Sequence, residues 1–130
     1  MDVVVTLPKS FRWNGNKPGL ASWVAEGDAA GGHETGEEYC FTCGVFKPRI
    51  EPGERVYVVH FGRLIGYAPL VRVSVEYGGR FGLIRAGGAV AVTIDEEIPG
   101  FRGFRYRWWD RSIERPFPDW LAVGERKVPK

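Results

Sequence analysis

The stretch from residue 55 to residue 77 reads RVYVVHFGRLIGYAPLVRVSVEY, and it contains the strongest secondary-structure signals in the chain. Its first part, residues 55–61, is a run of β-branched and aromatic residues, which is typical of a strand. Gly62 follows at once and supplies the conformational freedom that a tight turn needs. Residues 64–77 then return to a strand pattern. We therefore predict that residues 55–77 form an antiparallel hairpin in the middle of a curved sheet.

The second strand of this hairpin alternates apolar and polar side chains over its last part. Because successive side chains of a strand point to opposite faces, Val71, Val73 and Val75 are predicted to face the core. Pro69 has no amide hydrogen to donate, so its position predicts a bulge or a sheet edge.

Shorter segments on both sides of the hairpin have the composition of strands, and one has that of a helix. The predicted strands cover residues 2–7, 39–43, 89–94 and 101–109. The predicted helix covers residues 18–26, with Pro18 in its first turn and Gly27 at its end. The 18 glycines and 9 prolines also favour short strands joined by tight turns. We expect one domain over residues 1–130, α+β in class, in the form of a small, mostly antiparallel β-barrel with one or two short helices.

The composition is that of a globular protein without a membrane span. Hydrophobic residues make up 44% and charged residues 26% of the chain, and the formal net charge is +2. The longest purely apolar run is far shorter than the ~20 residues of a membrane helix, and no secretory signal is recognisable. With only two cysteines, the sequence favours a reduced, cytoplasmic protein. Because the net charge is small, any basic surface for nucleic acid must be local.

The hairpin region resembles the central hairpin of the PUA-like superfamily, which includes the ASCH and EVE domains. The resemblance rests on residues 53–56 (GERV) at the first strand, on Gly62 in the turn, and on residues 64–66 (LIG) where the second strand begins. It covers residues 2–94. The resemblance implies a pseudo-barrel whose cleft binds RNA or a flipped, often modified, base. It also implies an alternative, hydrolysis of acylated nucleosides or RNA, because a few ASCH domains have such activities.

The signature of the ASCH domain, Gly-x-Lys-x-x-Glu-x-Arg, is only half present. Gly15 and Lys17 match it, whereas Leu20 and Ser22 occupy the positions of the Glu and the Arg. The two missing residues would be the general acid or base and its partner, so the hydrolase interpretation is weakened. Residues 15–18 also fit a simple turn that leads into the predicted helix.

Cys40 and Cys43 form a CxxC pair, which raises the question of a zinc or redox site. A structural zinc ion needs four ligands, and His33 and His60 lie outside the spacings of zinc fingers. In a strand over residues 39–43 the two cysteines would also point to opposite faces. We therefore predict no metal and no cofactor, and we interpret both residues as ordinary thiols.

Residues 101–117 read FRGFRYRWWDRSIERPF and contain six aromatic residues and five arginines. Arginines beside aromatic rings are typical of a nucleic-acid cleft, where the charge attracts phosphates and the rings stack on bases. The alternative is that the aromatic side chains form core and that Arg105 and Arg107 pair with acids nearby in the sequence. Those acids are Asp95, Glu96, Glu97 and Asp110.

The sequence thus predicts a small module that binds nucleic acid, either RNA or a modified DNA base. Its candidate ligand-binding residues are aromatic or basic: Trp13, Lys17, Trp23, Tyr67, Arg105, Arg107 and Trp109. Two alternatives stay open, a small hydrolase that acts on nucleosides or RNA at the same cleft, and a protein-interaction domain. A pocket lined by Trp and Arg at the barrel mouth would favour binding. A buried aromatic face at residues 104–108 without a cleft would favour protein interaction.

Overall fold

The computed structural model describes residues 1–7, 12–13, 17–18, 38–86 and 90–116. This part of the chain forms short strands and two single-turn 3-10 helices. The strands are β1 (Val3–Thr6), β2 (Arg12–Trp13), β3 (Lys17–Pro18), β4 (Glu38–Gly44), β5 (Arg55–His60), β6 (Arg63–Val75), β7 (Phe81–Ala86), β8 (Val92–Thr93), β9 (Phe104–Tyr106) and β10 (Arg115–Pro116). The 3-10 turns are η1 (Tyr77–Gly79) and η2 (Arg111–Ile113). Neither turn, nor any other helix among the described residues, has the length and apolar character to cross a membrane.

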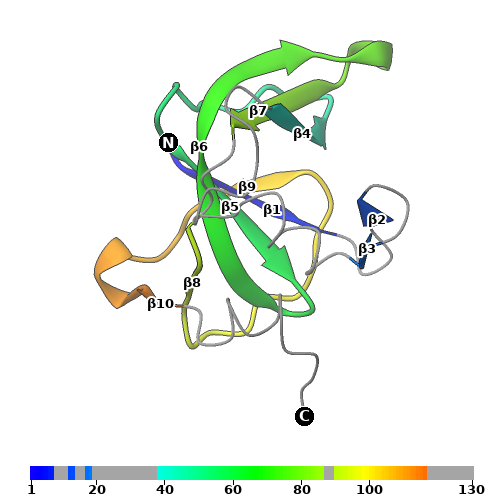
Figure 1. Ribbon diagram of the computed structural model, residues 1–130. Helices are drawn as coiled ribbons and strands as arrows, with labels where there is room; N and C mark the ends of the chain where they lie inside the picture. The colour runs from blue at the N-terminus through cyan, green and yellow to red at the C-terminus, as the bar shows by residue number, and fades with distance from the viewer. Residues whose placement is uncertain (8–11, 14–16, 19–37, 87–89, 117–130) are drawn as a thin grey trace.

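Six strands form one sheet that curls into a half-barrel (Figure 1). Its order is β4-β7-β6-β5-β1-β9, so β4 and β9 are the outer strands of the sheet as described. All neighbours in it run antiparallel except β1 and β5, which are parallel. The shorter strands pair as β8 with β10 and β2 with β3. The prediction of a small, mostly antiparallel, barrel-like β-fold is therefore confirmed in this coarse form.

The predicted hairpin is formed by β5 and β6, at the centre of the sheet. The chain turns at Phe61 and Gly62, whose φ angles are 52° and 79°. Positive φ at both central residues is what a type I′ turn requires, and this turn matches the twist of the strands that it joins. The two-residue turn fixes the pairing next to it, His60 with Arg63 and Val59 with Leu64, before a bulge at Ile65 shifts the register.

The sheet is buried on both faces, and β5 shows this most clearly. Val56 and Val58 belong to one apolar cluster, whereas Tyr57 and Val59 belong to a second cluster on the opposite face. All four residues are fully buried. A strand that is covered on both faces needs a continuous run of large apolar side chains, which explains the unbroken sequence in this segment.

The predicted inward orientation of three valines in β6 is wrong for Val75. This residue is 75% exposed, while Val73 packs half-buried against the first cluster and Val71 is half-buried. The pairing of β6 with β7 shifts its register between Leu70 and Arg72, close to the bulge expected at Pro69, and is regular from Arg72 to Val75. Beyond the bulge the strand leaves the core and continues into an exposed hairpin end.

Other predicted segments differ from the structure in extent. The helix predicted over residues 18–26 lies outside the described residues except for Pro18, which belongs to β3. The strand predicted over residues 89–94 is reduced to β8, and the one over residues 101–109 to β9. Gly103, whose φ is 72°, precedes β9 and takes the backbone out of the extended conformation there.

Candidate functional site

The structure does not bring the predicted ligand-binding residues together in one site, although three of them lie in or beside one cluster. Trp13 and Lys17 pair across the small sheet of β2 and β3, and Trp23 lies outside the described residues. Arg105 is exposed, and its guanidinium carbon lies 4.4 Å from the centre of the Phe101 ring. This is a cation–π contact on the surface of the sheet.

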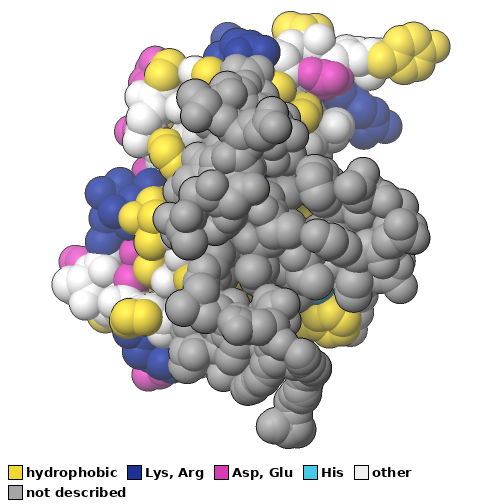
Figure 2. All heavy atoms as spheres, viewed as in Figure 1, with side chains coloured by type: hydrophobic (Ala, Val, Ile, Leu, Met, Phe, Trp, Pro, Cys, Tyr) yellow, Lys and Arg dark blue, Asp and Glu magenta, His cyan; other side chains and the backbone are white. Residues whose placement is uncertain are grey.

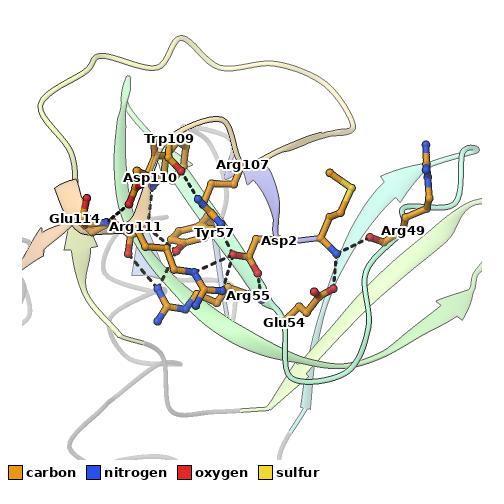
Figure 3. Close-up of polar contacts among 12 residues, drawn as sticks. Asp2, Arg49, Glu54, Arg55, Tyr57, Arg107, Trp109, Asp110, Arg111 and Glu114 are labelled. Carbon is orange, nitrogen blue, oxygen red and sulfur yellow. Dashed lines mark hydrogen bonds and ion pairs between the residues drawn. The ribbon is translucent and has the colours of Figure 1, made fainter.

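The other three predicted residues lie in or beside a polar cluster that joins the segment after β9 to the sheet (Figure 3). The members of this polar cluster are Asp2, Arg55, Tyr57, Arg107, Trp109, Arg111 and Glu114. Tyr67 lies beside it, because the guanidinium carbon of Arg55 is 4.0 Å from the centre of the Tyr67 ring. Two carboxylates organise the cluster.

Asp2 is the first of these carboxylates, and its side chain is only 3% exposed. It accepts hydrogen bonds from the backbone amide of Arg55 at 2.8 Å, from Nε of Arg107 at 2.9 Å and from Nη2 of Arg111 at 2.8 Å. Burial by itself would raise the pKa of the Asp2 carboxyl, but these hydrogen bonds outweigh it and hold the pKa below the ordinary value of 3.8. Asp2 is therefore ionised at neutral pH and ties three segments together.

Glu114 is the second carboxylate, with a side chain that is 6% exposed. It accepts hydrogen bonds from the Tyr57 hydroxyl at 2.5 Å, from Nε1 of Trp109 at 2.8 Å and from Nη1 of Arg55 at 3.1 Å. Burial, followed by the contact with Glu114, raises the pKa of Tyr57 above its ordinary value. Trp109 is 6% exposed, and its ring centre is 5.1 Å from that of Tyr57. Trp109 is thus part of the core.

Arg107, like Trp109, makes contacts within the protein. Its Nε pairs with Asp2, and its Nη1 donates to the backbone carbonyl of Trp109. The structure therefore agrees with the alternative that Arg107 pairs with an acid, although the acid is Asp2 and none of the four acids nearby in the sequence. An arginine in this position is already neutralised by a carboxylate.

A pocket of about 840 Å³ lies between the two outer strands of the sheet, and we call it the seam pocket. Its described lining consists of residues 5–7, 40–46, 80 and 101–104. One wall is thus β4 with the turn after it, and the other is the end of β1 with the segment that leads into β9. The two walls approach at Gly103, where a Cβ atom would lie 3.4 Å from the carbonyl oxygen of Cys43. The volume is within the range of small-ligand sites.

The seam pocket combines aromatic rings with positive charge. Phe46 is 77% exposed at its rim, and Arg80 and Arg102 are also exposed. The half-buried rings are Phe41, Phe101 and Phe104. Among the described residues that line it, none is Asp, Glu or His. Such a surface can hold a planar ring and attract an anionic group beside it.

The two cysteines line the seam pocket from β4. Cys40 is exposed and Cys43 is buried, as expected for two side chains on opposite faces of a strand. Cys43 Sγ donates to the backbone carbonyl of Phe81 at 3.4 Å, and burial raises the pKa of this thiol to about 11. Burial also raises the pKa of Cys40, so both groups are thiols at neutral pH and weak nucleophiles. Within the described ranges, no cluster of three or more His, Cys, Asp or Glu side chains could hold a metal ion.

Sequence reasoning identified only part of the seam pocket. It selected the Arg- and aromatic-rich segment that contains Arg102, but within that segment it chose Arg105 and Arg107. The sequence around Phe46 and Arg80 contains no motif that would indicate a ligand-binding site. The pairing of β4 with β7 brings them together, since Gly44 is opposite Phe81 in this pairing.

No protein-family profile, curated protein or solved structure matches this chain.

Proposed function

We propose that the protein binds single-stranded nucleic acid, RNA or DNA with a modified base, and takes a base into the seam pocket. One observation carries this proposal: a pocket of about 840 Å³ whose described lining contains four phenylalanines and two arginines but no acidic side chain. Aromatic rings stack on bases of any sequence, and arginines attract the phosphates on either side of a bound base.

A single strand fits this surface better than a duplex does. The bases of a duplex are stacked and paired, so that none can enter a pocket unless it is first flipped out. The bases of a single strand or a loop are free to stack on protein side chains. The mostly antiparallel, curled sheet also supports membership of the PUA-like superfamily, which we keep as part of the proposal.

The described lining of the seam pocket favours binding over hydrolysis. A hydrolase needs a general base or an activated nucleophile in contact with the substrate. The cysteines are the strongest nucleophiles in this lining, and the pKa of Cys43 is raised to about 11 by its burial. Raising a thiol pKa lowers the thiolate fraction, which is the opposite of what a nucleophilic cysteine requires.

Replacing Arg80 and Arg102 together by Ala is expected to weaken nucleic-acid binding and to flatten its salt dependence. Each lost phosphate contact lowers the slope of log K against log salt concentration by about 0.7 for a single strand, so the double variant should lose about 1.4. Fluorescence anisotropy of short labelled RNA and single-stranded DNA, over a series of salt concentrations, measures both effects.

Two further variants act as controls for this experiment. Arg115→Ala removes the same charge from β10, outside the seam pocket, where Arg115 pairs with Asp95. It should keep the wild-type slope. Phe46→Ala should cost ~1–3 kcal/mol of binding free energy and leave the slope unchanged, because a ring contributes stacking and no charge. The absence of binding to RNA, single-stranded DNA and modified-base DNA at low salt would refute the proposal.

A further inference from the structure

The hairpin of β6 and β7 ends in an aromatic residue that contributes nothing to the fold. Tyr77 is 99% exposed and begins the 3-10 turn η1. The backbone amide of Glu76 donates to the carbonyl of Arg80 at 2.6 Å and closes the end of the hairpin. Gly78 and Gly79, with φ angles of 78° and 76°, give the tight reversal that presents Tyr77 to solvent. Figure 1 shows this end reaching beyond the rest of the sheet.

The exposed Tyr77 is only a few residues away in the sequence from a residue that lines the seam pocket. Arg80, which lines the pocket, follows Tyr77 by three residues, so the two Cα atoms are at most about 11 Å apart. Phe46, which also lines the pocket, is 77% exposed and follows β4, the strand that pairs with β7. Figure 2 shows hydrophobic, basic and acidic side chains together at this projecting end of the molecule.

The charges at this end favour an anionic partner. Arg80, three residues after Tyr77, lines the seam pocket, and Arg102 lines the same pocket. The nearest acid in the sequence is Glu76, whose carboxylate accepts a hydrogen bond from the hydroxyl of Ser74. Single-strand-binding surfaces combine exposed aromatic rings, which stack on bases, with arginines, which attract phosphates.

We propose that Tyr77 stacks on a second base of the bound strand while the first base occupies the seam pocket. The ligand is then an oligonucleotide and not a free nucleoside or mononucleotide. This inference rests on the proposed function. The Cα atoms of Tyr77 and Arg80 are at most about 11 Å apart, so both contacts lie within reach of one short strand. The ligand that makes both contacts contains at least two nucleotides, one base for each.

The test compares oligonucleotide lengths and Tyr77 variants. Labelled oligo-U of one, two, four and eight nucleotides is titrated with the protein, and anisotropy gives the affinity of each. Wild-type affinity should rise from the mononucleotide to the length that reaches both contacts and then change little. Tyr77→Ala should lower the affinity for the eight-nucleotide RNA about 5- to 150-fold, the loss of one stacked base, and leave mononucleotide binding unchanged. Tyr77→Phe keeps the ring and should bind as the wild type does.

Ile113→Ala is the matched control, because Ile113 is an exposed apolar side chain (55%) outside the seam pocket. If Tyr77→Ala binds the eight-nucleotide RNA like the wild type, or if a mononucleotide binds as tightly as that RNA, the inference is wrong while the proposed function stands. Loss of self-association in Tyr77→Ala, measured by light scattering, with unchanged RNA affinity would assign Tyr77 to a protein contact instead and overturn the inference. No binding at any length would refute the proposed function itself.

Discussion

Replacing Asp2 by Ala is expected to lower the free energy of unfolding by about 3–5 kcal/mol, the cost of breaking one side of a buried ion pair. The Asp2 side chain is 3% exposed and accepts hydrogen bonds from two guanidinium groups and one backbone amide. Its removal leaves Arg107 without its carboxylate partner and the buried amide of Arg55 without an acceptor. Urea unfolding followed by circular dichroism measures the change.

Asp95→Ala is the matched control for this prediction. Asp95 also pairs with an arginine, Arg115, but its side chain is 89% exposed. Exposed pairs contribute about 0–1 kcal/mol, so this variant should unfold nearly as the wild type does. Equal effects of the two substitutions would show that Asp2 is not a buried anchor.

The stability contribution of Asp2 also depends on pH. Because the pKa of Asp2 in the folded protein lies below its ordinary value of 3.8, the folded state favours the ionised carboxyl. This contribution is complete above the unfolded pKa and is lost as the pH falls through the folded pKa. The stability difference between the wild type and Asp2→Ala should therefore shrink below about pH 4.

Replacing Trp109 by Ala is expected to lower the free energy of unfolding by about 3–5 kcal/mol, the usual cost of deleting a buried aromatic side chain. Trp109 is 6% exposed, packs against Tyr57 and donates to Glu114. Its removal creates a cavity and takes one donor from the buried Glu114 carboxylate. Thermal and urea unfolding both measure the loss.

The neighbouring Trp108 supplies the control for Trp109. It is 43% exposed, and its Nε1 donates to the exposed Glu96. Trp108→Ala removes an edge-to-face contact with Trp109 at 5.0 Å between ring centres but no buried side chain, so it should cost clearly less than Trp109→Ala. If Trp109→Ala kept full stability but lost affinity for RNA, Trp109 would be a ligand-stacking residue, as the sequence alone predicted.

The central hairpin could be predicted from the sequence because its signals are local. The β-branched run of β5 and the two-residue turn at Gly62 lie next to each other in the chain. The parallel pairing of β1 with β5 could not be predicted in this way, since it joins Val3 to Val56 across more than fifty residues. The exposure of Val75 likewise has no local sequence signal, because the strand continues regularly while its outer end leaves the core.

The site was only partly predictable for the same reason. The concentration of arginine and aromatic residues in 101–117 is visible in the sequence, but the partner of each arginine is not. Arg107 pairs with Asp2, at the opposite end of the described chain, whereas Arg102 remains at the seam pocket. We therefore expect Arg107→Ala to lower the stability of the protein and not to remove a contact with the nucleic acid.

A backbone-amide NMR titration with a short single-stranded RNA is the most direct measurement of binding at the seam pocket. The amide signals of residues 44–46, 80 and 101–104 should shift most, because these residues line the pocket next to its exposed rings and arginines. Signals from the buried polar cluster around Asp2 and Glu114 should change little. Shifts confined to the polar cluster, or the absence of any shift at low salt, would contradict nucleic-acid binding at the seam pocket.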